Sequence, residues 1–164
     1  MTKKTYIGIA VGIIALGTAI TLAQPNNQNE TGQTASPQTT ENSYDFGKIS
    51  MAEGIVQTSF TLRNDGTEPL TIQKMYTSCM CTVATLRTNT SADPGGEFGP
   101  FGMPGHGFIP SIDAVLRPQE EATIDVEFDP AAHGPAGIGR IERTIRIETD
   151  KEPVEFFIAA TVIP

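Results

Sequence analysis

The chain lacks the residues and motifs on which most catalytic sites depend. Its 164 residues include two cysteines, two histidines and no tryptophan. It contains no Gly-x-Ser-x-Gly elbow, no His-Glu-x-x-His pair and no glycine-rich phosphate loop. Its acidic residues in the stretch 120–127 are those that the solvated face of a strand needs, and they do not indicate a catalytic carboxylate pair. The sequence therefore predicts a protein that is not an enzyme.

Basic residues are also scarce. Lysine and arginine together number 11, against 19 aspartates and glutamates, so the formal net charge is -8. Contacts to phosphate groups require clustered basic side chains, and no such cluster is present. We therefore exclude nucleic acid as a partner. The acidic balance is typical of a soluble surface.

One long apolar run occurs near the N-terminus, from Tyr6 to Ala23, and Lys3 and Lys4 precede it. A helix with about 1.5 Å rise per residue would extend this run to roughly 27 Å, enough to cross the hydrocarbon core of a membrane. The two lysines keep the N-terminus in the cytoplasm, which directs the rest of the chain to the extracytoplasmic side. We predict that residues 1–23 form a single-pass anchor in the inner (cytoplasmic) membrane. The alternative is a signal peptide, in which case the cleaved protein is secreted.

The composition changes abruptly after this run. Residues 24–43 consist mainly of Gln, Asn, Thr, Ser and Pro, and Ala35 is the single apolar side chain apart from proline. Such a segment cannot bury enough apolar surface to compensate for the loss of conformational entropy on ordering. We predict a disordered polar spacer that holds the following domain near the membrane.

From residue 44 onward, apolar and polar side chains alternate between turn residues, which is typical of β-strands. The clearest strand is 122–128, in which Ile124, Val126 and Phe128 are expected to face inward. Further strands are predicted at residues 44–49, 55–64, 70–76, 82–86, 141–149 and 154–162. About seven short antiparallel strands predict an all-β, immunoglobulin-like sandwich over residues 44–164, preceded by one N-terminal hydrophobic helix.

Four segments, taken in order, carry a resemblance to a known family. They are Tyr44-Asp45-Phe46-Gly47-Lys48-Ile49, the run from Phe60 to Ile72, Ser78-Cys79-Met80-Cys81-Thr82, and the run from Ala122 to Asp129. The chain resembles the bacterial domain-of-unknown-function family 1573, which is similar to the immunoglobulin-like modules of major sperm protein and of the ASPM/SPD-2/Hydin group. The resemblance implies that fold and an extracytoplasmic setting, and the family has no established activity. Met80 stands where the family usually has glycine.

Cys79 and Cys81 are separated by one residue. In an extended strand both thiols would lie on one face, with Cα atoms about 6.5–7 Å apart, at the outer limit for a disulfide. A bond between them would therefore need a local bend. Three interpretations remain open: buried small apolar side chains, a reducible disulfide, or ligands of a soft metal ion.

The metal interpretation draws on residues farther along the chain. Met103 and His106 supply a thioether and an imidazole three residues apart. Together with Cys79 and Cys81 they form a ligand set that suits copper in its Cu(I) state. The second histidine, His133, is interpreted as a turn residue.

The stretch 87–113 is rich in Gly, Pro and Phe, and it is longer than the corresponding connection in the family. We expect it to be an irregular insertion. Its aromatic residues Phe98, Phe101 and Phe108 either bind a partner or fold back over the edge of the sandwich, because binding residues often lie on loops that a rigid scaffold supports.

Taken together, these features predict a non-catalytic, membrane-tethered, extracytoplasmic β-sandwich module with a structural or protein-interaction role. No cofactor is expected, and the partner is an unidentified envelope protein. The alternative is an extracytoplasmic protein that binds copper or exchanges thiols and disulfides, using Cys79 and Cys81 with Met103 and His106.

Overall fold

Strands form where the sequence alternates between apolar and polar side chains. The computed structural model describes residues 37–39, 41–91 and 93–164, which form ten strands and two short 3-10 helices, η1 (Met51–Glu53) and η2 (Gly134–Gly137). None of the helices in this part of the chain is long and apolar enough to cross a membrane. The apolar segment predicted at residues 1–23 lies outside the described residues, as does the spacer up to residue 36.

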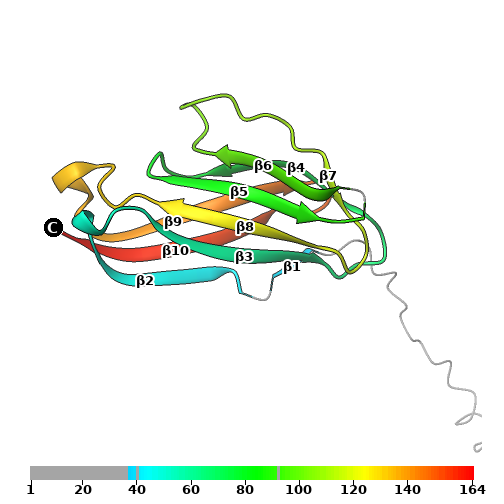
Figure 1. Ribbon diagram of the computed structural model, residues 1–164, viewed down its shortest axis with the longest axis horizontal. Helices are drawn as coiled ribbons and strands as arrows, with labels where there is room; N and C mark the ends of the chain where they lie inside the picture. Colours follow the sequence, from blue (N-terminus) through cyan, green and yellow to red (C-terminus); the bar gives the residue numbers. More distant parts are fainter. Residues whose placement is uncertain (1–36, 40, 92) are drawn as a thin grey trace, which may run out of the picture. The chain divides into compact units, whose positions relative to one another are not determined.

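The strands make two five-stranded sheets, which Figure 1 shows as two layers. The first sheet is antiparallel, in the order β1 (Pro37–Thr39), β3 (Val56–Asn64), β8 (Glu121–Phe128), β5 (Thr82–Asn89), β6 (Pro94–Phe101). The second sheet has the order β2 (Ser43–Ser50), β10 (Val154–Ile163), β9 (Gly139–Thr149), β4 (Leu70–Thr77), β7 (Ala114–Leu116). Its strands are antiparallel except β2, which runs parallel to β10.

The core lies between the two sheets. Phe60 of β3 stacks on Phe156 of β10 with ring centroids 4.8 Å apart, so aromatic side chains from both sheets meet in the interior. Ile124 and Val126 of β8 are fully buried, and Phe128 is 2% exposed. The inward face predicted for this strand is therefore confirmed.

All seven strands predicted from the sequence are present, and β1, β6 and β7 are additional. Each additional strand lies at the edge of a sheet. Edge strands pair on one side only and are often short, so they need no regular alternation of apolar residues. Consequently the expected irregular insertion contains the regular strand β6, and the stretch 24–43, expected as a disordered spacer, contains β1 and the first residue of β2.

The parallel pairing of β2 with β10 differs from the antiparallel arrangement that the sequence predicted. A hairpin turn fixes the relative direction of two consecutive strands. β2 and β10 stand far apart in the sequence, and no hairpin joins them. Short-range patterns therefore carried no information on their relative direction.

Asn64, at the end of β3, links the two sheets. Its side-chain amide donates to the carbonyls of Leu116 in β7 at 2.9 Å and of Glu68 at 2.8 Å. Its side-chain oxygen accepts from the N–H of Gly66 at 3.0 Å. The residue is fully buried, and its amide group uses both its donor and its acceptor capacity, as buried polar groups generally do. This one side chain fixes the turn after β3 and its position against the second sheet.

Candidate functional site

The two cysteines lie in a tight turn between β4 and β5. The N–H of Thr82 donates to the carbonyl of Cys79 at 3.2 Å, which closes the turn. The hydroxyl of Thr77 lies 3.0 Å from the carbonyl of Cys79 and 2.8 Å from that of Thr82. The bend brings the Cα atoms of Cys79 and Cys81 to 5.3 Å, and the two sulfurs are joined in a disulfide.

The disulfide is largely buried, while the residue between the two cysteines is not. Cys79 is 9% exposed and Cys81 is 3% exposed. Met80 is 53% exposed. The turn therefore directs both sulfurs toward the protein and the methionine side chain toward solvent.

Each sulfur has a nitrogen-bearing side chain beside it. Nε2 of His133 lies 3.2 Å from Sγ of Cys79, and Nε of Arg143 donates to Sγ of Cys81 at 3.3 Å. The backbone N–H of Cys81 also donates to Sγ of Cys79, at 3.4 Å. Positive charges and N–H donors favour a thiolate over a thiol. The surroundings therefore suit sulfur atoms that gain negative charge.

Two later segments of the chain form hydrogen bonds with this turn. After β8 ends, the N–H of Asp129 donates to the carbonyl of Cys81 at 2.9 Å, so the β8–β9 connection that carries His133 begins against the cysteine turn. In β9, Thr144 and Ser78 exchange two hydrogen bonds of 2.9 Å, one of them to the Ser78 hydroxyl. Arg143 precedes Thr144 and is held beside the turn by this pairing.

Met103 and His106 lie in the loop that follows β6, here called the 102–113 loop. The N–H of His106 donates to the carbonyl of Met103 at 3.2 Å, so the two residues share a turn. Among the described residues, Cys79, Cys81 and His133 form a group whose ligand atoms lie within 4.8 Å of one another, and His106 is not in it. The histidine beside the cysteines is thus the one that was interpreted as a turn residue.

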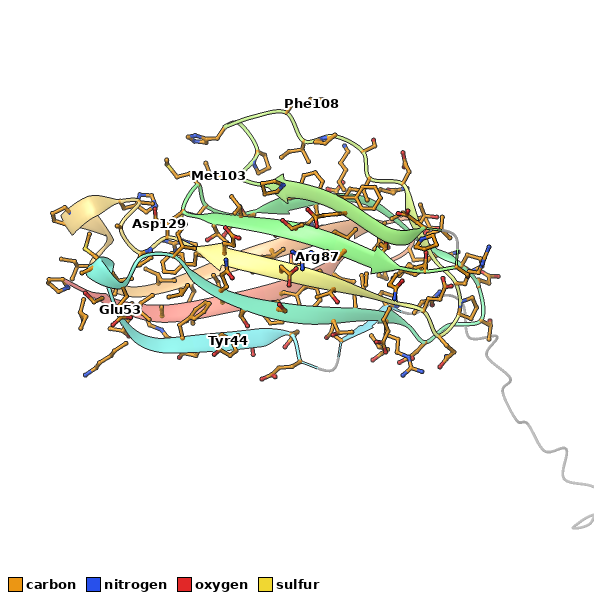
Figure 2. All side chains as sticks on the ribbon, in the orientation of Figure 1. Tyr44, Glu53, Arg87, Met103, Phe108 and Asp129 are labelled. Carbon is orange, nitrogen blue, oxygen red and sulfur yellow. A yellow bond between two sulfur atoms is a disulfide. The ribbon has the colours of Figure 1, made fainter. Side chains whose placement is uncertain are left out.

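The 102–113 loop extends beyond β6 (Figure 1) and borders a hollow of about 720 Å³. We call it the loop hollow, and it is lined in part by Met80, Phe98, Phe101, Met103, His106 and Phe108. Figure 2 shows Phe108 on the outer bend of the loop and Met103 near the end of β6.

The three phenylalanines of this region have different surroundings. Phe101 is 5% exposed and belongs to the core, and Phe98 is partly buried against that core. Phe108 is 89% exposed. Phe101 therefore packs onto the sandwich, whereas Phe108 is open to solvent, and the partner-binding interpretation stays a prediction.

Several solved structures are similar to this chain. A protein of unknown function from Porphyromonas gingivalis W83 aligns with a TM-score of 0.55 and 14% identity, over 84% of this chain and 51% of that one. A family 123 glycoside hydrolase from Clostridium perfringens aligns with a TM-score of 0.49 and 9% identity, over 81% of this chain and 27% of that one. The ASH/PapD-like domain 7 of human CEP192 gives a TM-score of 0.43 and 15% identity, over 85% and 93% of the two chains.

This chain therefore spans about half of the Porphyromonas protein and about a quarter of the glycoside hydrolase. At 14% identity the Porphyromonas likeness concerns the fold alone. A comparison with curated proteins gave no match. Residues 37–98 match the family described as a protein of unknown function (DUF1573), which is the family that the sequence resembles.

Proposed function

We propose that this chain is a non-catalytic binding module: an immunoglobulin-like β-sandwich, tethered on the extracytoplasmic side of the cytoplasmic membrane, that holds an envelope protein at the loop hollow. The observation that carries the proposal is the exposure of Phe108, 89%, at the border of a hollow of about 720 Å³. Exposing a large apolar side chain to water is unfavourable, and aromatic residues at the rim of a hollow commonly anchor a partner.

The surroundings of Phe108 support this assignment. Met80 is 53% exposed and lines the same hollow, and the adaptable methionine side chain is frequent at binding surfaces. Phe101 also lines the hollow and is 5% exposed, so this part of the lining belongs to the core. The site thus combines a lining residue fixed in the core with exposed apolar side chains, which suits an apolar side chain of another protein.

The partner that fits is a protein segment that presents an apolar side chain. The sequence feature that supports an envelope location is the apolar run from Tyr6 to Ala23 behind Lys3 and Lys4. The net charge of -8 favours a neutral or basic partner surface, because like charges on two surfaces oppose their association.

Site-specific photo-crosslinking tests the proposal in cells that produce the full chain. Phe108 is replaced by a photoreactive phenylalanine analogue, and the same analogue at Phe157 serves as the matched control. Phe157 is 40% exposed on β10, in the second sheet, and is not among the residues that line the loop hollow. We expect a discrete crosslinked protein from position 108 and none from position 157. Met80→Ser should reduce the yield at position 108.

Equal crosslinking from both positions, or no crosslinked protein from position 108, would refute a binding role of the hollow. The location is tested separately, by protease treatment of intact spheroplasts. The domain should be digested without lysis, whereas protection until lysis would place it in the cytoplasm and refute the tethered arrangement.

A second candidate function is the binding of Cu(I). Cys79, Cys81 and His133 offer three ligand atoms within 4.8 Å, and thiolate and imidazole ligands suit this ion once the disulfide is reduced. Titration of the reduced full chain with Cu(I) against a competing chelator tests it. His133→Ala should weaken binding and His106→Ala should not. The reverse result would favour the ligand set with Met103 and His106 that the sequence indicated.

A further inference from the structure

We propose that the Cys79–Cys81 bond is an oxidising, redox-active disulfide that accepts two electrons from the thiols of another molecule, and that His133 and Arg143 stabilise the two thiolates formed. This activity goes beyond the binding function proposed for the loop hollow and does not depend on it. It rests on three features: the short loop that the bond closes, the donors at its two sulfurs, and the unequal exposure of the two cysteines.

The first feature argues against a purely structural role. A disulfide stabilises a fold mainly by restricting the unfolded chain, and this effect is smallest when the bonded residues are close in sequence. Cys79 and Cys81 are two positions apart. The bond also joins residues that the hydrogen bonds of Thr77 and Thr82 already hold in a turn. The fold therefore depends little on this bond.

The second feature, the donors at the two sulfurs, favours the reduced form of the cysteine pair. A sulfur in a disulfide is neutral and accepts hydrogen bonds weakly, whereas a thiolate accepts strong, charge-assisted ones. The contacts of His133 with Cys79, at 3.2 Å, and of Arg143 with Cys81, at 3.3 Å, are therefore stronger after reduction. Stabilisation of the reduced form makes a disulfide more oxidising.

The burial of the sulfurs reinforces this reasoning. An unpaired thiolate at a site as enclosed as Cys81, which is 3% exposed, would be unfavourable because burial penalises the charged form. The guanidinium of Arg143 supplies the compensating charge. Arg143 is itself partly buried, so water screens its attraction to the sulfur less than at an open surface.

The third feature sets the order of the exchange. Cys79 is the more exposed of the two, at 9%, so the thiolate of an incoming molecule attacks its Sγ. A mixed disulfide forms at Cys79, the Cys79–Cys81 bond breaks, and the electron pair leaves on Sγ of Cys81 beside Arg143. A second thiolate then attacks the incoming molecule's sulfur in the mixed disulfide and releases Cys79 as a thiolate beside His133. Two thiols have then become one disulfide, with two electrons passed to the chain and the two thiol protons released to solvent.

Equilibration with glutathione tests the proposal on the full chain in detergent. Two molecules of reduced glutathione and the Cys79–Cys81 disulfide give two protein thiols and one glutathione disulfide. Acid quenching, alkylation and mass spectrometry measure the fraction reduced at each ratio, and hence the equilibrium constant. His133→Ala and Arg143→Ala should each lower this constant by about tenfold, because each removes a hydrogen bond to a charged acceptor.

The chain provides a matched control. Arg140→Ala removes an arginine of the same strand that pairs with Asp45 at 2.8 Å. This control should stay within about twofold of the parent chain, and Arg143→Lys, which keeps the charge, should recover part of the loss. Near-ultraviolet and far-ultraviolet circular dichroism check that each variant is folded.

Three results would overturn the proposal. One is an equilibrium constant that neither His133→Ala nor Arg143→Ala changes by more than about twofold. Another is a bond that glutathione does not reduce at any attainable ratio. The last is a protein that shows two free thiols when it is purified and alkylated without reductant.

Discussion

Replacement of Asn64 by alanine should lower the free energy of unfolding by more than the few side-chain atoms removed would suggest. The side chain is fully buried and makes three hydrogen bonds, to Leu116, Glu68 and Gly66. Leu116 belongs to the second sheet and Asn64 to the first, so the substitution removes a polar link between the two layers. It also releases the turn that follows β3.

The magnitude follows from the partners left behind. The Leu116 carbonyl and the Gly66 N–H are buried, and a buried polar group left without a partner costs about 1–3 kcal/mol. The Glu68 carbonyl is only partly buried, so water replaces much of its lost bond. The free energy of unfolding should therefore fall by about 2–6 kcal/mol, a large share of the roughly 5–15 kcal/mol typical of a domain.

Urea unfolding of the full chain, followed by far-ultraviolet circular dichroism, measures this loss. Asn89→Ala is the matched control, because Asn89 is exposed on β5, and its effect should stay within about 0.5 kcal/mol. Asn64→Asp should be worse than Asn64→Ala at neutral pH, since a carboxylate would face two carbonyls without a proton to donate. A loss below about 1 kcal/mol for Asn64→Ala, or an aspartate variant as stable as the parent chain, would refute this account of the link.

Three further predictions follow from the fold. Phe156→Ala should lower the free energy of unfolding in urea by about 3–5 kcal/mol, because Phe156 is fully buried against Phe60, and a loss below about 1 kcal/mol would contradict its central position. Hydrogen bonds from Ser91 and from the N–H of Arg117 lower the pKa of Glu120 from 4.5 to about 2, so its contribution to stability is present above pH 4.5 and is lost as the pH falls toward 2. The difference in melting temperature between the parent chain and Glu120→Gln should shrink in that window, and an equal difference at pH 7 and pH 2.5 would exclude the mechanism. Finally, residues 37–164 should fold alone into a soluble all-β domain, and a strongly helical circular dichroism spectrum of this fragment would contradict it.

The central strands were predictable because each has one face in the core. In β8, Ile124, Val126 and Phe128 alternate with polar residues, and this pattern specifies both the strand and its inward face. β6 has no such pattern, since its sequence Pro-Gly-Gly-Glu-Phe-Gly-Pro-Phe is dominated by glycine and proline. Backbone pairing with β5 defines it instead, and that pairing is a long-range property of the sheet.

The candidate site was predictable only in part, for a similar reason. Two cysteines one residue apart are visible in any sequence, but His133 lies 54 positions from Cys79 and Arg143 lies 62 positions from Cys81. One signal existed. The strand at 122–128 pairs with β5 so that Phe128 lies opposite Thr82, which places the residues after 128 beside those before 82. Strand register would therefore have indicated His133, whereas Met103 and His106 were chosen by their ligand chemistry.

The cysteine turn links the two proposals without merging them. Met80 stands between the bonded cysteines, yet it is 53% exposed and lines the loop hollow, while the sulfurs on either side of it are enclosed. A partner seated against Met80 would contact the backbone segment that carries the disulfide. The side chains beside the sulfurs, His133 and Arg143, are not among the residues that line the loop hollow. Substitutions that abolish binding at the hollow should therefore leave the reduction equilibrium of the disulfide unchanged. Substitutions of His133 or Arg143 should leave the apolar lining of the hollow unchanged.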